Sequence, residues 1–454
     1  MTLDDICVRG APSDRAPGGA AENEPSSREN RPTAASTPSR ARARVIFLNR
    51  FFFPDHSATS QILSDLAFHL AGCGIDVRVV TSRQRYDDPA ADLPAAEWVA
   101  GVRIDRVATT RFGRSALIGR GFDYLSFYRS AQRSIAAWAR PGDVLVAKTD
   151  PPLLGVAVMR TAARRGLHLV NWLQDLYPEI ATALRVPLVG GPPGRALGRL
   201  RDASLRAAAA NVVVGQGMAG TVRRRGIPEA RIRIVPNWCD DEAIRPVAPE
   251  HNPLRRDWGL CDRFVVGYSG NLGRGHEFGT FLEAAQRLRD DPGFCFLFIG
   301  GGNKSPELAD AVRARELRHL FCFRPYQDRK LLGLSLSVAD VHLVSLKPEL
   351  EGLMVPSKLY GIAAAARPIV AVTARDGEIA RLVERYRCGV VVEPGNAALL
   401  ADTLRELCAD RGRVREMGRR ARAMLDARFT RRHGLERWRN LVEQLVSSPQ
   451  RIAR

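Results

Sequence analysis

The stretch VSLKPELEGLMVPSKLYGIAAAARPIVAVT, residues 344–373, decides the fold. Its first residues complete an apolar strand, 341–345, and its last residues, PIVAVT, form a second one. Between them lie an acidic loop and a helix whose alanines, 363–366, end at Arg367-Pro368. A strand, a helix and a strand in this order predict two parallel neighbours in a buried sheet.

The same alternation continues in both directions along the chain. Short apolar strands alternate with helices of roughly 10–15 residues in two successive stretches. The pattern predicts an α/β protein with two Rossmann-like, doubly wound parallel-sheet domains, 43–240 and 241–430, that face a cleft. The pattern at 431–454 predicts a helix that returns toward the first domain, followed by a tail. Residues 1–42 hold few large apolar side chains, so we expect a disordered N-terminal extension.

Composition excludes several classes of protein. Of the 454 residues, 45% are hydrophobic, but no stretch of roughly 18 residues is apolar throughout, so no transmembrane helix is expected. Eight cysteines occur without a C-x-x-C pair, which argues against a zinc site or a disulfide framework and fits a reducing cytoplasm. The formal net charge of +19 predicts attraction to phosphorylated substrates or anionic lipid headgroups. Aromatic residues are not interleaved with the basic ones, so nucleic acid is not expected as a partner.

Two glycine-rich loops follow strands of the second half. The first, GYSGNLGRGHEF at 267–278, could bind a phosphate through backbone N–H groups, with basic side chains to neutralise it. Its residues of interest are Gly270, Asn271, Gly273, Arg274 and His276. The second loop, FIGGGNK at 298–304, contains Gly301 and suggests another wall of the same cleft. A tight turn with solvated polar groups would leave the same pattern.

The crossover at 344–373 has two interpretations. Carboxylates such as Glu349 and Glu351 can accept hydrogen bonds from sugar hydroxyls, and the amides of residues 352–355 can bind an anion beside Lys358. The acids could instead cap a helix. Spacing alone leaves both interpretations open.

The loop NWLQDLYPEIA, residues 171–181, follows a strand of the first half. Asp175 and Glu179 could orient a substrate hydroxyl or act as a base there, beside Trp172 and Gln174. They could also cap a helix with Pro178 in its first turn.

Four segments carry a resemblance to a known family: WLQDLYPE, VPNWCD, GYSGNLGRGHEF and PELEGLMVPSKLYGIAAAARP. Together they resemble the retaining, nucleotide-sugar-dependent glycosyltransferases of family 4, which have the GT-B fold. The resemblance covers nearly everything from Arg44 to Val446 and is strongest for the bacterial branch that builds cell-surface polysaccharide. No single segment would be specific, but their number and order are.

The resemblance implies transfer of a sugar from a nucleoside diphosphate sugar to a hydroxyl, with retained configuration, in exopolysaccharide, capsule or lipopolysaccharide synthesis. The acceptor would be a polyprenyl-diphosphate-linked glycan or an oligosaccharide. No cofactor and no metal are expected, because fixed positive groups would stabilise the leaving diphosphate. The cleft loops also lack a clear Asp-x-Asp.

The resemblance favours a sugar-nucleotide clamp over a helix cap for the crossover at 344–373, and it implies roles for individual residues. Those implied to be catalytic are Asp175, Glu179, Arg274, His276 and Glu351. Those implied to bind the donor are Gly270, Asn271, Gly273, Gly301, Arg324, Tyr326, Gly352, Leu353, Met354, Val355, Ser357 and Lys358. Those implied to lie on the acceptor side are Phe53, Pro54, Ser57, Ser60, Trp172 and Gln174.

The chain departs from the family pattern at several positions. Glu351 resembles the first glutamate of the family's Glu-x7-Glu motif. The second glutamate should fall near Leu359 or Gly361, and neither is a carboxylate, so the ribose contact is unassigned. Asn271 and His276 stand where the wider family usually has Arg and Lys. A nucleotide-sugar epimerase of the same fold, or a nucleotide-sugar-binding scaffold subunit with weak catalysis, remain as alternatives.

The pattern at Ser115–Arg140 predicts a helix that carries aromatics and arginines. Such a helix could make peripheral contact with an anionic membrane, which would place a cytoplasmic enzyme at the inner face of the plasma membrane. An ordinary amphipathic helix packed on the sheet would show the same pattern.

Overall fold

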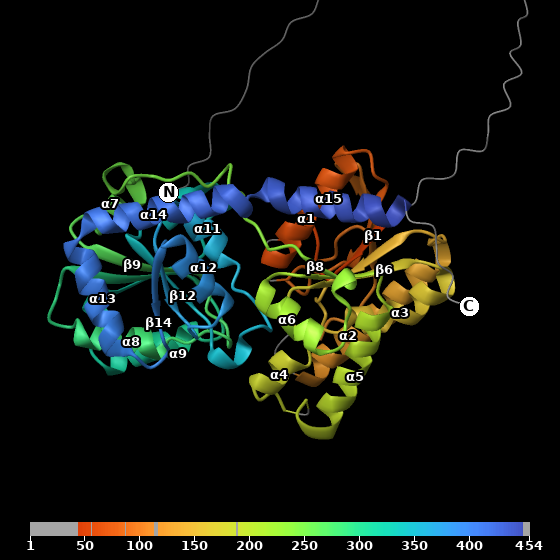
Figure 1. The fold of residues 1–454 in the computed structure, drawn as a ribbon, viewed down its shortest axis with the longest axis horizontal. Coiled ribbons are helices and arrows are strands. Elements are labelled where there is room, and N and C mark those ends of the chain that lie inside the picture. Colours follow the sequence, from red (N-terminus) through yellow and green to blue (C-terminus); the bar gives the residue numbers. More distant parts are fainter. Residues whose placement is uncertain (1–43, 56, 87, 113–116, 188, 448–454) are drawn as a thin grey trace, which may run out of the picture. The chain divides into compact units, whose positions relative to one another are not determined.

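The computed structural model describes residues 44–55, 57–86, 88–112, 117–187 and 189–447. It contains two α/β sheets, each with helices on both faces, and confirms the predicted fold class (Figure 1). The extension expected at 1–42 and the tail after residue 447 lie outside the described residues.

The first sheet has eight strands in the order β3-β4-β2-β1-β5-β6-β7-β8. In chain order they are β1 (Val45–Leu48), β2 (Val77–Ser82), β3 (Ala96–Val99), β4 (Val102–Val107), β5 (Val144–Ala147), β6 (His168–Leu173), β7 (Ala210–Val213) and β8 (Ile232–Ile234). All neighbours are parallel except β3, which pairs antiparallel with β4. Ala100 and Gly101 make the two-residue turn between β3 and β4, both with positive φ, as a tight hairpin requires.

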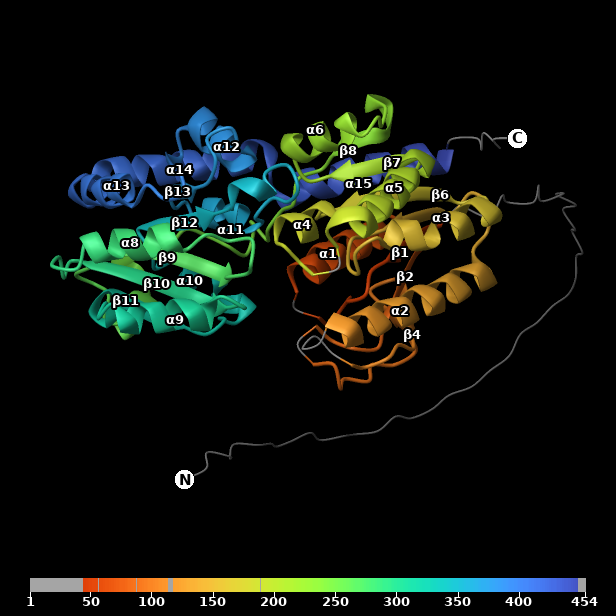
Figure 2. The same ribbon diagram turned by 90° about the horizontal axis from the view of Figure 1, so that it is seen from below.

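Side chains alternate between the two faces of this sheet. On β1, Val45 and Phe47 belong to the core under α1 (Ala58–Gly72), while Ile46 and Leu48 belong to the core under α2 (Leu117–Trp138) and α3 (Leu154–Arg165). Figure 2 shows the ribbons of β1 and of these three helices. The remaining helices of this half are α4 (Glu179–Ala183), α5 (Gly191–Ala207) and α6 (Gln216–Arg224). Burial on both faces explains why β1 and β5 read as continuous apolar runs.

The second sheet has six strands in the order β11-β10-β9-β12-β13-β14. They are β9 (Phe264–Asn271), β10 (Phe294–Gly301), β11 (Phe321–Arg324), β12 (Val341–Ser345), β13 (Ile369–Val372) and β14 (Gly389–Val392), all parallel. Its helices are α7 (Pro253–Asp257), α8 (Gly279–Arg287), α9 (Ser305–Ala314), α10 (Leu332–Ser337), α11 (Lys358–Ala364), α12 (Glu378–Tyr386), α13 (Ala397–Ala409) and α14 (Arg411–Arg428).

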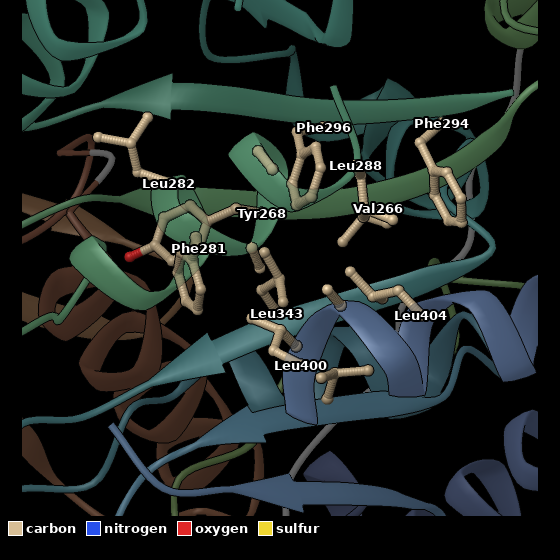
Figure 3. Close-up of a cluster of buried hydrophobic side chains, with 14 of the residues drawn as sticks. Val266, Tyr268, Phe281, Leu282, Leu288, Phe294, Phe296, Leu343, Leu400 and Leu404 are labelled. Carbon is tan, nitrogen blue, oxygen red and sulfur yellow. The ribbon is translucent and has the colours of Figure 1, made fainter. Parts of the chain in front are cut away.

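The largest core cluster of the second half lies under α8 and α13. Tyr268 on β9 packs with Phe281, Leu343 and Leu400, and all four are buried (Figure 3). The apolar body of Tyr268 thereby fixes the end of β9, where the first glycine-rich loop begins.

The last helix, α15 (Arg431–Ser447), contributes to the core of the first sheet. Trp438 is fully buried there, with ring centroids 6.5 Å from Phe47 and 4.5 Å from Trp172. Arg431 at its start donates to Asp65 of α1 at 3.0 Å. The last helix therefore packs against the first half of the chain.

Candidate functional site

The two glycine-rich loops lie side by side because β9 and β10 are parallel neighbours. Gly270 pairs in register with Gly300, and Asn271 with Gly301. A Cβ at Gly300 would lie 2.5 Å from the carbonyl oxygen of Gly270, so only glycine allows this approach. The ring of Tyr326 covers the same glycines, with its Cε1 3.1 Å from where a Gly300 Cβ would stand.

Lys358, at the start of α11, reaches into this group. Its ammonium lies 3.6 Å from the centroid of the Tyr268 ring, and its Cε lies 4.0 Å from where a Cβ of Gly270 would be. The ammonium is buried and has no hydrogen-bond partner among the described residues. Burial lowers the pKa of Lys358 well below its usual value. A buried cation in this state beside glycine backbone is a site suited to an anion.

His276 lies on the other side of Tyr268, with ring centroids 5.9 Å apart. Burial and the nearby charge of Lys358 lower the pKa of His276 to about 3, so the imidazole is neutral at physiological pH. Its Nδ1 lies 2.7 Å from the carbonyl oxygen of Ser345, which can only accept, so Nδ1–H donates and Nε2 remains an acceptor. His276 therefore adds no positive charge, contrary to the expectation that it would neutralise a phosphate.

The other polar residues expected at the donor site differ in exposure. Arg274 and Asn271 are exposed at the loop, and no described residue forms a salt bridge with Arg274. Tyr326 is 62% exposed at the edge of the sheet, next to the glycines that it covers. Arg324, at the end of β11, lies over the Trp258 ring at 5.3 Å.

Glu351 caps a helix. This finding corrects the expectation that the crossover is a sugar-nucleotide clamp and not a helix cap. Its Oε1 accepts a hydrogen bond from the Thr373 hydroxyl at 2.5 Å, and its Oε2 accepts from the backbone N–H of Glu378 at 3.2 Å. Glu378 is the first residue of α12, so the capped helix is not the one that follows in sequence. The sequence could not reveal this cap because the helix begins 27 residues later.

The carboxylate of Glu378 reaches the first half of the chain. Its Oε2 accepts a hydrogen bond from the backbone N–H of Gly217 at 2.7 Å, in the first turn of α6. Gly352, with φ of 71°, lies against the same turn, where a Cβ would come within 2.8 Å of the Thr221 hydroxyl. Glu351 and Glu378 thus connect the crossover, α12 and α6.

The crossover backbone also pairs with the loop after β6. The N–H of Leu176 donates to the carbonyl oxygen of Leu353 at 2.9 Å, and Asp175 and Met354 form an antiparallel bridge. The Met354 sulfur lies 3.4 Å from where a Cβ of Gly275 would stand. Met354 of the crossover therefore adjoins both Asp175 and the first glycine-rich loop.

The carboxyl of Asp175 has an unusual environment. Burial raises its pKa to about 6, the negative charge of Asp150 adds to the rise, and the positive charge of Lys148 opposes it. Lys148 and Asp150 are functional candidates that sequence reasoning missed. The available signal was their position directly after the buried strand β5, since ligands of open α/β sheets bind at the carboxyl ends of the strands.

The carboxylate of Glu179, unlike that of Asp175, is paired with arginines. Both its carboxylate oxygens bind Arg201, at 2.9 and 2.5 Å, and Arg225 donates to Oε1 at 2.8 Å. Two arginines already satisfy this carboxylate at the start of α4, an arrangement that favours a structural role.

The loop expected on the acceptor side is divided between surface and core. Phe53 is 39% exposed, and Pro54 and Ser57 are partly exposed. Ser60, in contrast, is fully buried near the start of α1. Only the first three residues are therefore accessible to an acceptor.

Two other residues expected on the acceptor side are buried. Trp172 is only 1% exposed and stacks on Trp238 at 6.4 Å, so its ring belongs to the core and not to a cleft surface. Gln174 accepts a hydrogen bond from Asn237 at 2.7 Å and is 7% exposed. Both side chains hold the loop after β6 in place.

The remaining residues expected on the donor side line the two ends of the crossover and the first loop. Val355 is buried and Ser357 is partly exposed, just before α11 begins. Gly273 borders the side chain of Asn271 in the first glycine-rich loop.

The part of the chain that the structure describes offers no obvious metal site. It contains no group of three or more His, Cys, Asp or Glu side chains that could hold a metal ion. Among the same described residues, no helix is long and apolar enough to span a membrane.

Comparison with known proteins identifies the family of the chain. Residues 58–238 match the glycosyl transferase 4-like domain, and residues 263–410 match the glycosyl transferases group 1 family. The Pseudomonas aeruginosa glycosyltransferase WbjE is 26% identical over 340 residues, which are 74% of this chain and 83% of that protein. The Escherichia coli colanic acid biosynthesis glycosyl transferase WcaI is 29% identical over 264 residues, 56% of this chain and 64% of that protein.

Solved structures share the fold at low sequence identity. Sucrose-phosphate synthase from Thermosynechococcus elongatus has a TM-score of 0.73 at 18% identity, covering 90% of this chain and 100% of that chain. Anabaena HepE in complex with UDP-glucose has a TM-score of 0.66 at 16% identity, covering 89% and 100%. With two family domains matched in order on two parallel α/β sheets, the chain belongs to the family 4 glycosyltransferases of GT-B fold.

Proposed function

We propose that this glycosyltransferase moves a sugar from a nucleoside diphosphate sugar to a hydroxyl, with retained configuration. The observation that carries the proposal is the buried ammonium of Lys358, which lies beside Gly270 and has no hydrogen-bond partner among the described residues. A diphosphate would supply the missing negative charge, and the exposed Arg274 in the same loop would add a second cation. The likeness to HepE, which was solved with UDP-glucose, supports a nucleotide-sugar donor.

The chemistry follows from which groups are charged. In a front-face transfer, the sugar–phosphate bond breaks as the acceptor oxygen attacks the anomeric carbon from the same side, and the leaving phosphate takes up the acceptor proton. Lys358, Arg274 and the loop amides would stabilise the charge that develops on the diphosphate. Neutral His276 would accept a hydrogen bond from a sugar hydroxyl through Nε2. With these fixed cations, the proposed transfer uses neither a metal nor a cofactor.

Asp175 is the best placed carboxylate for the acceptor. It adjoins Met354 of the crossover and follows Gln174 of the first half, so it stands where the donor loops meet the acceptor-side loop. A carboxylate there would orient the attacking hydroxyl. The relatives WbjE and WcaI, the latter named for colanic acid biosynthesis, support a glycan acceptor in cell-envelope polysaccharide synthesis. A polyprenyl diphosphate would carry that glycan.

A surface on α2 and the loop before it would hold the cytoplasmic enzyme at the inner face of the plasma membrane. Phe112, Phe122 and Leu125 are 61%, 56% and 41% exposed, and the two phenylalanine rings lie 6.0 Å apart. Arg129 and Arg133 are exposed one and two turns further along the helix. Aromatic side chains beside arginines suit an interface rich in anionic headgroups.

The test is a transfer assay with the purified full chain. It is incubated with UDP-, GDP- and CDP-sugars and with polyprenyl-diphosphate-linked glycans, and both nucleotide release and acceptor product are followed. We expect one sugar nucleotide to give a product whose anomeric proton coupling, measured by NMR, matches that of the donor.

Three other results would each overturn a part of the proposal. A product of inverted configuration would overturn retention. An isomerised sugar nucleotide without acceptor product would overturn transfer. A sugar nucleotide that binds without being consumed, with every acceptor, would overturn catalysis by this chain.

A further inference from the structure

A second buried lysine lies at the carboxyl end of the first sheet. Lys148 follows β5 directly and is 2% exposed. Its ammonium donates to the carbonyl oxygen of Thr59 at 2.5 Å and lies 4.2 Å from the ring centroid of Trp172. An ammonium can donate three hydrogen bonds, and this one makes a single hydrogen bond and one cation–π contact, so its direct contacts neutralise little of its charge. The compensation comes from Asp150 and Asp175, whose negative charges both act on it.

Lys148 and Asp175 also line one small cavity. Its volume is about 30 Å³, enough for one water molecule, and Thr149, Asn171 and Arg201 line it as well. The rest of the lining is mainly apolar, so the two groups share an environment of low dielectric constant, in which their mutual attraction is strong.

We propose that Lys148 is a positioning residue for the transfer reaction, whose ammonium keeps Asp175 ionised beside the crossover so that Asp175 can accept the hydrogen bond of the acceptor hydroxyl. This inference rests on the proposed function. Burial lowers the pKa of Lys148 to about 7 and raises that of Asp175 to about 6. Burial therefore disfavours the charge of each group, and each group favours the charge of the other.

The surrounding elements contribute further titratable or charged groups. Asp150 opposes ionisation of Asp175, and Tyr177 interacts with it from the same loop. Arg120 and Tyr124 on α2 act on Tyr177, and Arg201 on α5 lines the cavity. Tyr128 on α2 interacts with Asp150 and with Arg50 after β1. Lys148 is the cation that favours the Asp175 carboxylate.

The identity of residue 148 is itself informative. Lysines and arginines together number 68, and only five of them are lysines: Lys148, Lys304, Lys330, Lys347 and Lys358. The larger, planar head of an arginine would have to displace the contacts that residue 148 makes with Thr59 and Trp172. A compact ammonium fits this site.

The experiment compares pH profiles of kcat/KM for the wild type, Lys148→Met and Lys330→Met. Lys330 is an exposed lysine of the second half and makes none of the contacts of Lys148. Without the Lys148 ammonium, the pKa of Asp175 rises. The acid limb of the kcat/KM profile should therefore move to higher pH, by about one to three pH units. Activity of Lys148→Met should be low near pH 6.5 and recover toward wild type near pH 9, whereas Lys330→Met should follow the wild type. A uniform loss at every pH would mean that Lys148 only supports the fold, and would overturn the inference.

A second pair of variants keeps the inference testable if Lys148→Met folds poorly. Asp175→Asn and the double variant Lys148→Met/Asp175→Asn both lack the carboxyl on which the ammonium acts. Removing Lys148 in that background should no longer move the acid limb of the residual activity, and a limb that still moves would overturn the inference. Turnover by the wild type is measured first. An inactive wild type would mean that the proposed function is wrong, whereas an active wild type with unshifted variants would mean that only the inference about Lys148 is wrong.

Discussion

The ammonium of Lys358 lies 3.6 Å from the ring centroid of Tyr268 and has no hydrogen-bond partner within the described chain. Tyr268 is anchored in the core by Phe281 and Phe298, and its hydroxyl donates to the carbonyl oxygen of Asn271 at 3.1 Å. The core of the second half thus holds both the cation and the glycine-rich loop in place. A buried charge without a partner costs folding free energy, and a bound anion would offset that cost.

Binding of the donor should take up a proton. Burial lowers the pKa of Lys358, and a diphosphate beside the ammonium would raise it again. Above the lowered pKa, binding therefore protonates Lys358, and affinity should strengthen as the pH falls. Calorimetry with an intact sugar nucleotide, in buffers of different ionisation enthalpy, measures the uptake. Proton release, or affinity that rises with pH, would contradict it.

Glu351 should have separable roles in stability and turnover. Glu351→Ala removes the acceptor at the start of α12 and should cost about 0.5–2 kcal/mol of unfolding free energy. Glu351→Gln retains one acceptor oxygen and should lose less stability, yet both variants should transfer sugar slowly if Glu351 also contacts the donor. Urea unfolding and transfer assays on the same preparations decide this. If Glu351→Gln turns over like the wild type, Glu351 acts only as a cap.

His276 should make the protein sensitive to acid. Its folded pKa of about 3 is lowered from 6.5, so the stability it contributes is present above pH 6.5 and is lost as the pH falls toward 3. Between pH 7 and pH 5 the loss from this residue should reach up to about 2 kcal/mol. His276→Asn should flatten that part of the stability curve, measured by denaturant unfolding at both pH values. Equal pH dependence in both proteins would contradict the buried, neutral imidazole.

The exposed aromatics near α2 should control membrane binding. Phe112→Ser/Phe122→Ser should reduce sedimentation of the protein with anionic vesicles. Arg129→Ser/Arg133→Ser should weaken vesicle binding by about 1 kcal/mol for each arginine and make the binding less dependent on salt. Trp98, 62% exposed on β3, offers a matched control in Trp98→Ser. If that control loses binding as strongly as the phenylalanine variant, the contact surface is elsewhere.

Much of the fold could be predicted because apolar strands and glycine-bearing strand ends are local signals. The crossover from β12 to β13 follows directly from its sequence pattern. The β3–β4 hairpin escaped prediction, since its strand β3 is half exposed and its turn, Ala100-Gly101, lacks the usual Asn-Gly signal.

The candidate site was less predictable because its key relationships are long-range. Glu179 and Asp175 look equivalent in sequence, but Glu179 meets Arg201, 22 residues away, and Asp175 lines a cavity together with Lys148. Nothing local in the sequence shows that Lys148 will be buried there.

The tryptophan of the same loop shows a related difficulty. Trp172 was expected near the acceptor, yet it meets Trp238 and Trp438 in the core. Trp438 comes from the last helix, so the pairing depends on the return of α15 to the first sheet. A residue at the end of a strand can point into the core or toward a ligand, and the sequence around it does not distinguish the two.

The most direct test is calorimetric titration of UDP, GDP and CDP sugars into the wild type, Lys358→Met and the exposed-site control Lys330→Met. We expect the wild type and the control to bind one sugar nucleotide equally well. Lys358→Met should bind it roughly 10- to 150-fold more weakly, from the loss of a charged hydrogen bond worth about 1.5–3 kcal/mol, while its melting temperature stays the same or rises. Equal affinity in Lys358→Met, or no binding of any sugar nucleotide by the wild type, would contradict the assignment of this site.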